Sequence, residues 1–127
     1  MSVEKLKQLH HQQQPLMIAN TWDAISAKAA EKAGLKVMGT LSHAIANMLG
    51  YEDGEVIPFN EMFFVIEKIA KASSLLVSCD IEAGYSDEPN EVANNVKQLV
   101  DIGVVGINLE DGLTKGKDRV LGDASIL

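Results

Sequence analysis

The sequence predicts an α/β fold made of parallel (β/α) units, and two observations support this prediction. Predicted strands alternate with predicted helices along the chain, and the connections between them are short, which favours parallel strands joined by crossover helices. The strand segments are nearly continuous apolar runs, typical of strands that are covered on both faces. These observations leave an open doubly wound sheet and a (β/α)8 barrel as equal alternatives.

Local signals set the limits of the elements. Thr21 or Asp23 is placed to cap one helix, and Gly34 is placed to end it. Pro89 falls in the first turn of a later helix, and Gly103 falls at its end. The predicted elements are, in order, a helix at 3–12, a strand at 15–20, a helix at 21–34, a strand at 36–40, a helix at 43–50, a turn-rich loop at 51–58, a helix at 60–72, a strand at 75–84, a helix at 87–103 and a strand at 104–111.

Composition excludes several classes of function. Eighteen acidic residues stand against eleven basic ones, and the net charge of −7 argues against a nucleic acid or an anionic membrane as partner. No apolar run approaches the roughly 20 residues that span a bilayer. The polar N-terminus has no signal-peptide core, and Cys79 is the single cysteine, so we expect a cytoplasmic protein without disulfides.

Acidic side chains follow the predicted strands at the edge where parallel α/β proteins bind ligands. Asp80 and Glu82 follow a buried strand, and alternation along that strand predicts that both lie on one face. Asp53 and Glu110 lie at the same edge, although Glu110 fits a helix cap as well as a metal ligand. Neighbouring carboxylates repel one another unless a cation binds them, and an oxygen-only set suits Mg²⁺ or Mn²⁺.

Three segments give the chain a resemblance to a known family. They are PLMIANTWDAISAKAAEKAGLKVMGTLSHAIANMLGYEDGE, then CDIEAGY, then VGINLEDG. Together they resemble the isocitrate lyase and phosphoenolpyruvate mutase superfamily, and more narrowly its phosphonomutase-like branch, the carboxyvinyl-carboxyphosphonate phosphorylmutase-like members. The resemblance implies a (β/α)8 barrel with Mg²⁺ at its carboxyl rim. It also implies chemistry that makes or breaks a C–C or P–C bond beside a small 2-oxo acid or phosphonate, through an enolate.

The resemblance implies a metal site. The motif D-x-D-x-G-Y matches the segment from Asp80 to Tyr85, so Asp80 falls on the direct metal ligand and Glu82 on an acid that holds metal-bound water. Asp53, in the run LGYED, and Glu110, in the fourth-strand acid motif, fall on further acids of the same shell.

The resemblance also implies substrate contacts in the stretch TLSHA. Thr40, Ser42 and His43 fall where the family grips the substrate carboxylate, and His43 is additionally a candidate acid or base. The lyase branches carry a Lys-Lys-Cys-Gly loop with a catalytic cysteine between the third and fourth strand motifs. This loop is missing here, which removes the case for isocitrate or methylisocitrate lyase activity.

The predicted strands number four, whereas the family's barrel has eight. Residues 1–127 are therefore predicted to form one (β/α)4 unit, the N-terminal half of a barrel. The stretch from 112 onward fits a gating loop with Lys115 and Lys117, although these lysines are more typical of a solvated surface. The segment 120–127 is predicted to open a helix, with Asp123 as its cap. Open edges on four strands favour a homo-oligomer, and the alternative to an enzyme is a catalytically silent half-barrel that folds by self-association.

Overall fold

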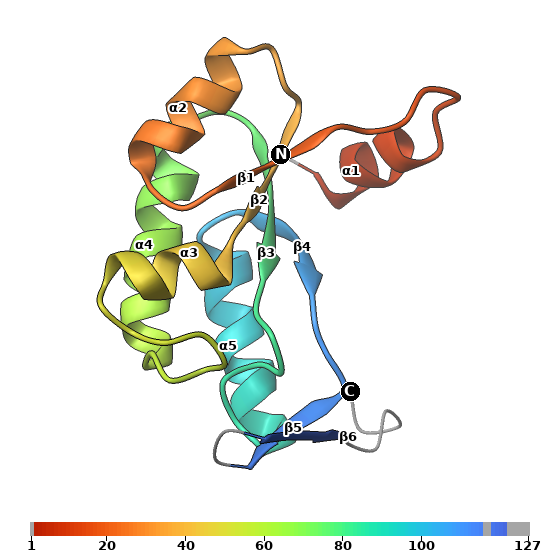
Figure 1. Ribbon diagram of the computed structural model, residues 1–127. Helices are drawn as coiled ribbons and strands as arrows, with labels where there is room; N and C mark the ends of the chain where they lie inside the picture. Colours follow the sequence, from red (N-terminus) through yellow and green to blue (C-terminus); the bar gives the residue numbers. More distant parts are fainter. Residues whose placement is uncertain (1, 116–117, 122–127) are drawn as a thin grey trace.

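A four-stranded parallel sheet in the order β1-β2-β3-β4 organises the chain in the computed structural model, which describes residues 2–115 and 118–121 (Figure 1). A separate antiparallel pair, β5 with β6, follows it. The elements are α1 (Val3–His10), β1 (Ile18–Thr21), α2 (Ala24–Lys32), β2 (Val37–Thr40), α3 (Ser42–Met48), α4 (Phe59–Ala72), β3 (Leu76–Asp80), α5 (Pro89–Asp101), β4 (Val104–Asn108), β5 (Gly112–Lys115) and β6 (Asp118–Leu121).

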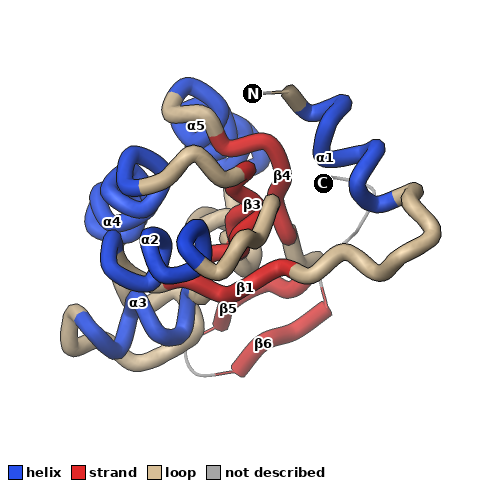
Figure 2. Tube along the Cα trace, turned by 90° about the horizontal axis from the view of Figure 1, so that it is seen from above, coloured by secondary structure: helices blue, strands red, loops and turns tan. Residues whose placement is uncertain are grey.

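The two faces of the sheet are covered differently (Figure 2). Helices α2, α4 and α5 lie on one face, which we call the outer face, and α1 lies on the other, inner face. The main core fills the outer face, where Met38, Val77 and Cys79 pack against helix residues such as Ile66 and Leu99. This alternation of strand residues between two covered faces confirms the α/β class and the parallel (β/α) units.

Helix α1 covers the inner face at the amino ends of the strands. Leu6 is its buried residue, and it packs against Val37 and Leu76 of the two central strands. Val105 of β4 packs against the same small cluster. The inner face is therefore apolar where the strands begin and is capped there by a single amphipathic helix.

One irregularity interrupts the pairing of β3 with β4. Val77 pairs with Val104, but Ser78 pairs with Gly106, so Val105 is an extra residue on β4. Such a β-bulge shifts the register of every following residue by one position. Beyond it, Asp80 stands opposite Asn108.

Three sequence-based expectations are corrected by the structure. Strand β3 ends at Asp80, so Glu82 does not share a strand face with it as alternation predicted; residues 81–84 form a turn instead. The stretch predicted as a gating loop contains the β5–β6 hairpin, in which Thr114 pairs with Arg119. In the segment predicted to open a helix, Val120 and Leu121 belong to β6, whereas the predicted cap Asp123 and the residues after it lie outside the described part of the chain.

None of the described helices is long and apolar enough to cross a membrane.

Candidate functional site

Asp80 occupies the centre of the carboxyl edge of the sheet, and two predicted substrate-binding residues hold it. Its Oδ2 accepts a hydrogen bond from Ser42 Oγ at 2.6 Å, and its backbone N–H donates to Thr40 Oγ1 at 3.1 Å. Its Oδ1 accepts from the backbone N–H of Glu82 at 3.2 Å. Ser42 and Thr40 are buried, so these contacts fix the position of the carboxylate. Ser42 and Thr40 thus support Asp80 directly.

The turn after β3 has an unusual backbone. Glu82 and Tyr85 adopt positive φ values of 49° and 63°, which L residues seldom do, and Gly84 has φ 91°. The Gly84 carbonyl accepts from Asn95 Nδ2 at 2.9 Å, which ties the turn to α5. Strained residues of this kind concentrate at functional sites, and here the strain brings Glu82 back beside Asp80.

Glu82 is buried, with 4% of its surface exposed, and its carboxylate is held from two sides. Its Oε2 accepts from Tyr85 OH at 3.2 Å and from the backbone N–H of Glu55 at 3.2 Å. The Glu55 carboxylate reaches back to the same turn, where its Oε1 accepts from the backbone N–H of Ala83 at 2.6 Å. Glu55 and Glu82 therefore lock the loop before α4 to the turn after β3.

Glu55 is a site residue that the sequence analysis missed. It lies two positions beyond Asp53 in the loop before α4, and it adopts a positive φ of 64°. The available signal was the run Asp-Gly-Glu, in which a glycine between two acids allows the chain to fold back. That signal does not reveal which distant backbone the second acid will meet.

Burial raises the pKa of the Tyr85 phenol well above its usual range. The carboxylates of Glu82, Glu55 and Asp80 raise it further, because a phenolate beside them would add another negative charge. The proton therefore stays on Tyr85 at neutral pH and is available to the Glu82 carboxylate. The same repulsion shows that three carboxylates act on one small volume.

His43 and Asp53 form a separate pair at the surface. His43 Nδ1 lies 3.3 Å from Asp53 Oδ2, and His43 Nε2 lies 2.9 Å from Asn47 Nδ2. Both side chains of the pair are more than half exposed. In this arrangement Asp53 orients His43. The hydrogen bonds that hold Asp80 are made with Ser42, Thr40 and Glu82 instead, so the structure does not join these two predicted residues to the central group.

Glu110 lies just beyond the end of β4, beside the same turn. Its backbone N–H donates to the backbone carbonyl of Glu82 at 2.7 Å, which joins the chain after β4 to the turn after β3. We use the name rim site for the central group at this edge, which consists of Thr40, Ser42, Glu55, Asp80, Glu82 and Tyr85.

The rim site fits a hard divalent cation in its donor chemistry, because its ionisable side chains offer oxygen atoms. Within the described part of the chain, no three His, Cys, Asp or Glu side chains form a group arranged to hold a metal ion. Mg²⁺ commonly keeps several waters and binds through one or two carboxylates, so Asp80 with a neighbouring acid is a sufficient protein contribution. Cys79 lies beside the site but is fully buried, and burial raises the pKa of its thiol to about 12, so it stays protonated.

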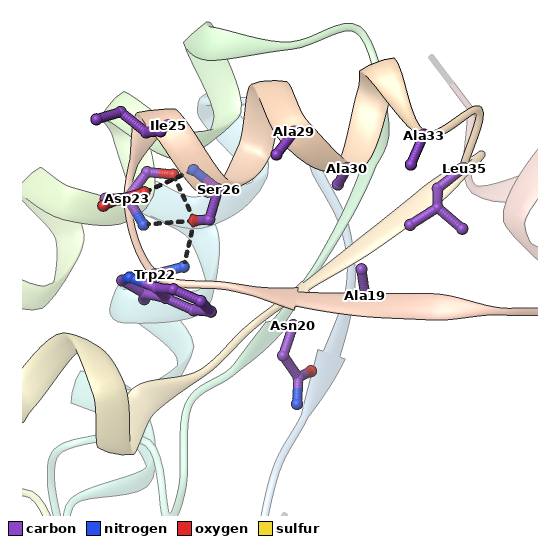
Figure 3. A pocket seen from close by; sticks show the side chains of 10 residues that line it. All are labelled: Ala19, Asn20, Trp22, Asp23, Ile25, Ser26, Ala29, Ala30, Ala33 and Leu35. Atoms are coloured by element: carbon purple, nitrogen blue, oxygen red, sulfur yellow. Dashed lines mark hydrogen bonds between the residues drawn. The ribbon is translucent and has the colours of Figure 1, made fainter.

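A groove runs between β1 and α2 on the edge of the molecule, and Figure 3 shows its lining. Its volume is about 460 Å³, and Ala19, Ala29 and Ala33 give it a smooth apolar wall. Trp22 and Ile25 stand at one end, 41% and 78% exposed. We refer to this feature as the β1–α2 groove. Its lining is mainly aliphatic, which separates it from the rim site in chemistry.

The family model for phosphoenolpyruvate phosphomutase matches residues 6–125, almost the whole chain. The chain belongs to this family. An uncharacterised protein of Mycobacterium tuberculosis is 38% identical over 103 residues, which are 81% of this chain and 38% of that protein. An oxaloacetate decarboxylase of Rhodopseudomonas palustris is 31% identical over 109 residues, 84% of this chain and 36% of the decarboxylase.

Solved structures of the superfamily match the fold over nearly the whole chain. A candidate phosphonomutase from Burkholderia cenocepacia superposes with a TM-score of 0.88 at 35% identity, covering 98% of this chain and 49% of that one. Oxaloacetate acetylhydrolase, in complex with its product oxalate, gives a TM-score of 0.78 at 26% identity, covering 93% and 43%. The chain thus spans half or less of these proteins, and its four parallel strands with their crossover helices correspond to half of a barrel, which confirms the predicted fold class.

Proposed function

We propose that the rim site makes this chain the metal-binding half of a lyase or mutase that acts on a small 2-oxo acid or phosphonate. The observation that carries the proposal is the Asp80 carboxylate, fixed at the carboxyl edge by Ser42 and Thr40 and placed against buried Glu82. Such a preorganised group favours charge stabilisation during reaction. The relatives named as oxaloacetate decarboxylase and oxaloacetate acetylhydrolase support a small oxo acid as substrate.

The residues divide into four roles in this proposal. Asp80 is the direct ligand for Mg²⁺ or Mn²⁺, and the acids that hold the coordinated water are Glu82, Asp53 and Glu110. When bound, the cation supplies positive charge that offsets the charge of an enolate. Thr40 and Ser42 keep Asp80 in position and, with His43, line the approach of the substrate carboxylate. His43, oriented by Asp53, is the proposed acid–base group.

A thermal-shift titration tests the proposal. Oxalate is a planar dianion that mimics the enolate of pyruvate, and a ligand that binds only the folded state raises the melting temperature. We expect Mg²⁺ and oxalate together to stabilise the protein, each alone to do much less, and Asp80→Asn to abolish the effect. Asp101→Asn, on the exposed side of α5, is the matched control and should behave like the wild type. A full response in Asp80→Asn would refute the metal assignment.

The exposed apolar edge favours the alternative, a silent half-barrel that self-associates. Strands β1 and β4 are the two edges of the parallel sheet, and Ile18 and Ile25 are exposed near β1. Parallel sheets normally have no open edge with exposed apolar side chains. Sedimentation equilibrium separates the two functions: the alternative predicts a dimer that Ile25→Ser weakens, and a well-folded monomer excludes it.

A further inference from the structure

A second hollow lies on the inner face of the sheet, next to the rim site and toward the amino ends of the strands. It has a volume of about 370 Å³ and is bounded by α1 and by residues of all four parallel strands. Its polar side chains come from different strands: Asn20 from β1, Thr40 from β2, Ser78 from β3 and Asn108 from β4. We call it the inner cavity. Neither the proposed metal ligands nor the substrate-carboxylate residues account for most of this lining.

The floor of the inner cavity is one transverse row of the sheet. Asn20 pairs with Gly39, Gly39 with Ser78 and Ser78 with Gly106, so these four residues stand side by side. Side chains that share a row point to the same face, and glycine alternates here with a small polar residue. The row two positions earlier along each strand contains Ile18, Val37 and Leu76. Leu6 of α1 packs against Val37 and Leu76 there. The inner face thus changes from apolar to polar two residues before Asp80 along β3.

The two glycines create the hollow. A Cβ atom on Gly39 would lie 3.2 Å from Asn20 Oδ1, and a Cβ atom on Gly106 would lie 3.0 Å from Ser78 Oγ and 2.9 Å from Leu6 Cδ2. Any larger residue would therefore fill the floor and push against the polar atoms. Neither glycine has a positive φ, so backbone conformation does not require them. Space is what they provide.

The inner cavity adjoins the rim site. Ser78 precedes Asp80 by two residues on the same strand face, a distance of about 7 Å along the strand. Asn108 stands opposite Asp80 in the register, and Thr40 both lines the cavity and accepts the Asp80 backbone hydrogen bond. A ligand whose acid end is held at the rim site by the proposed cation can therefore extend its other end into the cavity.

The lining also defines what kind of group fits there. The cavity is lined by two amides, two hydroxyls and the His10 imidazole, and the described lining has no carboxylate, ammonium or guanidinium group. Ser78 is half-buried at the floor, whereas Asn20, Asn108 and His10 are exposed at the mouth. A neutral hydroxyl finds donors and acceptors among these groups, and the lining offers no opposite charge to a charged tail. An aliphatic tail alone would displace water from these polar groups without replacing its hydrogen bonds.

We propose that the inner cavity is the specificity pocket for the substrate's tail, and that it selects a 2-oxo acid with a short, uncharged, hydroxyl-bearing chain. This inference rests on the proposed function, which places the acid end at the rim site. Ser78, Asn20 and Asn108 recognise the hydroxyl, and Gly39 with Gly106 leaves room for the chain.

Three probes of similar size test the tail preference by calorimetry in the presence of Mg²⁺. 4-Hydroxy-2-oxobutanoate and 2-oxopentanoate have the same number of heavy atoms and differ by a hydroxyl against a methyl, and oxaloacetate carries a charged tail. We expect the hydroxyl probe to bind at least fivefold more tightly than the methyl probe, about the effect of one net hydrogen bond. Oxaloacetate should bind more weakly than the hydroxyl probe.

Two variants locate the preference. Ser78→Ala should reduce the hydroxyl preference to about twofold, since one donor is lost, and Gly39→Ala should weaken both tailed probes. Both variants should bind oxalate with Mg²⁺ as the wild type does, because oxalate has no tail. Ser86→Ala, at the surface next to α5, is the matched control and should change neither affinity. Circular dichroism checks that each variant is folded.

The outcomes separate this inference from the proposed function. If oxalate binds but the three tails bind equally, the pocket assignment is wrong and the metal site stands. A ¹⁵N-edited NMR titration with the hydroxyl probe, run with and without Mg²⁺, covers the case in which oxalate does not bind. Shifts of the Gly39 and Gly106 amides and of the Asn20 side chain support the pocket on their own, and unchanged signals there refute it.

Discussion

The rim site and the β1–α2 groove border the same sheet, but they are held together by different kinds of contact. In the rim site, Ser42 meets Asp80 across 38 residues, and Glu55 meets Ala83 across 28. Beside the groove, Asp23 and Ser26 form a capping box within one turn of α2 (Figure 3). The comparison teaches that the groove is locally encoded, whereas the rim site depends on the whole sheet being in register.

The largest effect that distinguishes the two regions should come from the turn of the rim site. Gly84 has φ 91°, and a Cβ atom there would lie 2.6 Å from Val92 Cγ1. We expect Gly84→Ala to lower the free energy of unfolding by about 2–4 kcal/mol, combining backbone strain with overpacking. Urea denaturation measures this loss.

Gly50 provides the matched control for that substitution. It has a similar φ of 84°, but a Cβ atom there would meet nothing within 4 Å. Gly50→Ala should therefore cost only the left-handed backbone, about 1 kcal/mol. Equal losses for both variants would show that the turn after β3 is not packed as described.

A smaller difference should appear when one hydroxyl is removed from each region. Ser42→Ala leaves one oxygen of the half-buried Asp80 carboxylate without its donor, and we expect a loss of about 1–2 kcal/mol. Ser26→Ala leaves Asp23 able to accept from the backbone N–H at position 26, so a loss of about 0.5–1 kcal/mol is expected. Denaturation of both variants at one pH tests the order, and a larger loss for Ser26→Ala would reverse the comparison.

The smallest effect is a pH dependence on the groove side. Hydrogen bonds from the backbone and side chain of Ser26 hold the pKa of Asp23 below its ordinary value of 3.8. A carboxyl with a lowered folded-state pKa stabilises the protein above its unfolded pKa, and this contribution is lost as pH falls through the folded pKa. We expect Asp23→Asn, which keeps the cap, to flatten the urea midpoint below pH 4 relative to the wild type. An unchanged profile would contradict the assignment.

The contrast also explains how far the sequence could predict the molecule. The order of helices and strands follows from local periodicity and caps, and Asp23 caps α2 as predicted. Asp80 was found because an acid after an apolar strand is a local signal. Glu55 was missed because its role depends on Ala83 and Glu82, which only the folded chain brings near. The alternation rule failed for Glu82 because β3 ends at Asp80, four residues before the predicted end at 84.

His43 and Asp53 show the same limit from the other side. The resemblance assigned them to the substrate and metal contacts, and they remain predictions. The structure pairs them with each other through a 3.3 Å contact at the surface. A sequence motif identifies candidate residues, but it does not determine which neighbour each side chain contacts.

The bulge at Val105 shifts the register of strand β4 by one residue, and this exchanges which of its side chains face the inner cavity. Counted from Val104 in regular pairing, the segment VVGIN would set Val105 opposite Ser78 and Ile107 opposite Asp80, as an apolar wall. Because Val105 is the extra residue, Gly106 stands opposite Ser78 and Asn108 stands opposite Asp80 instead. The polarity of the inner cavity therefore depends on the register of β4 as much as on its amino-acid composition.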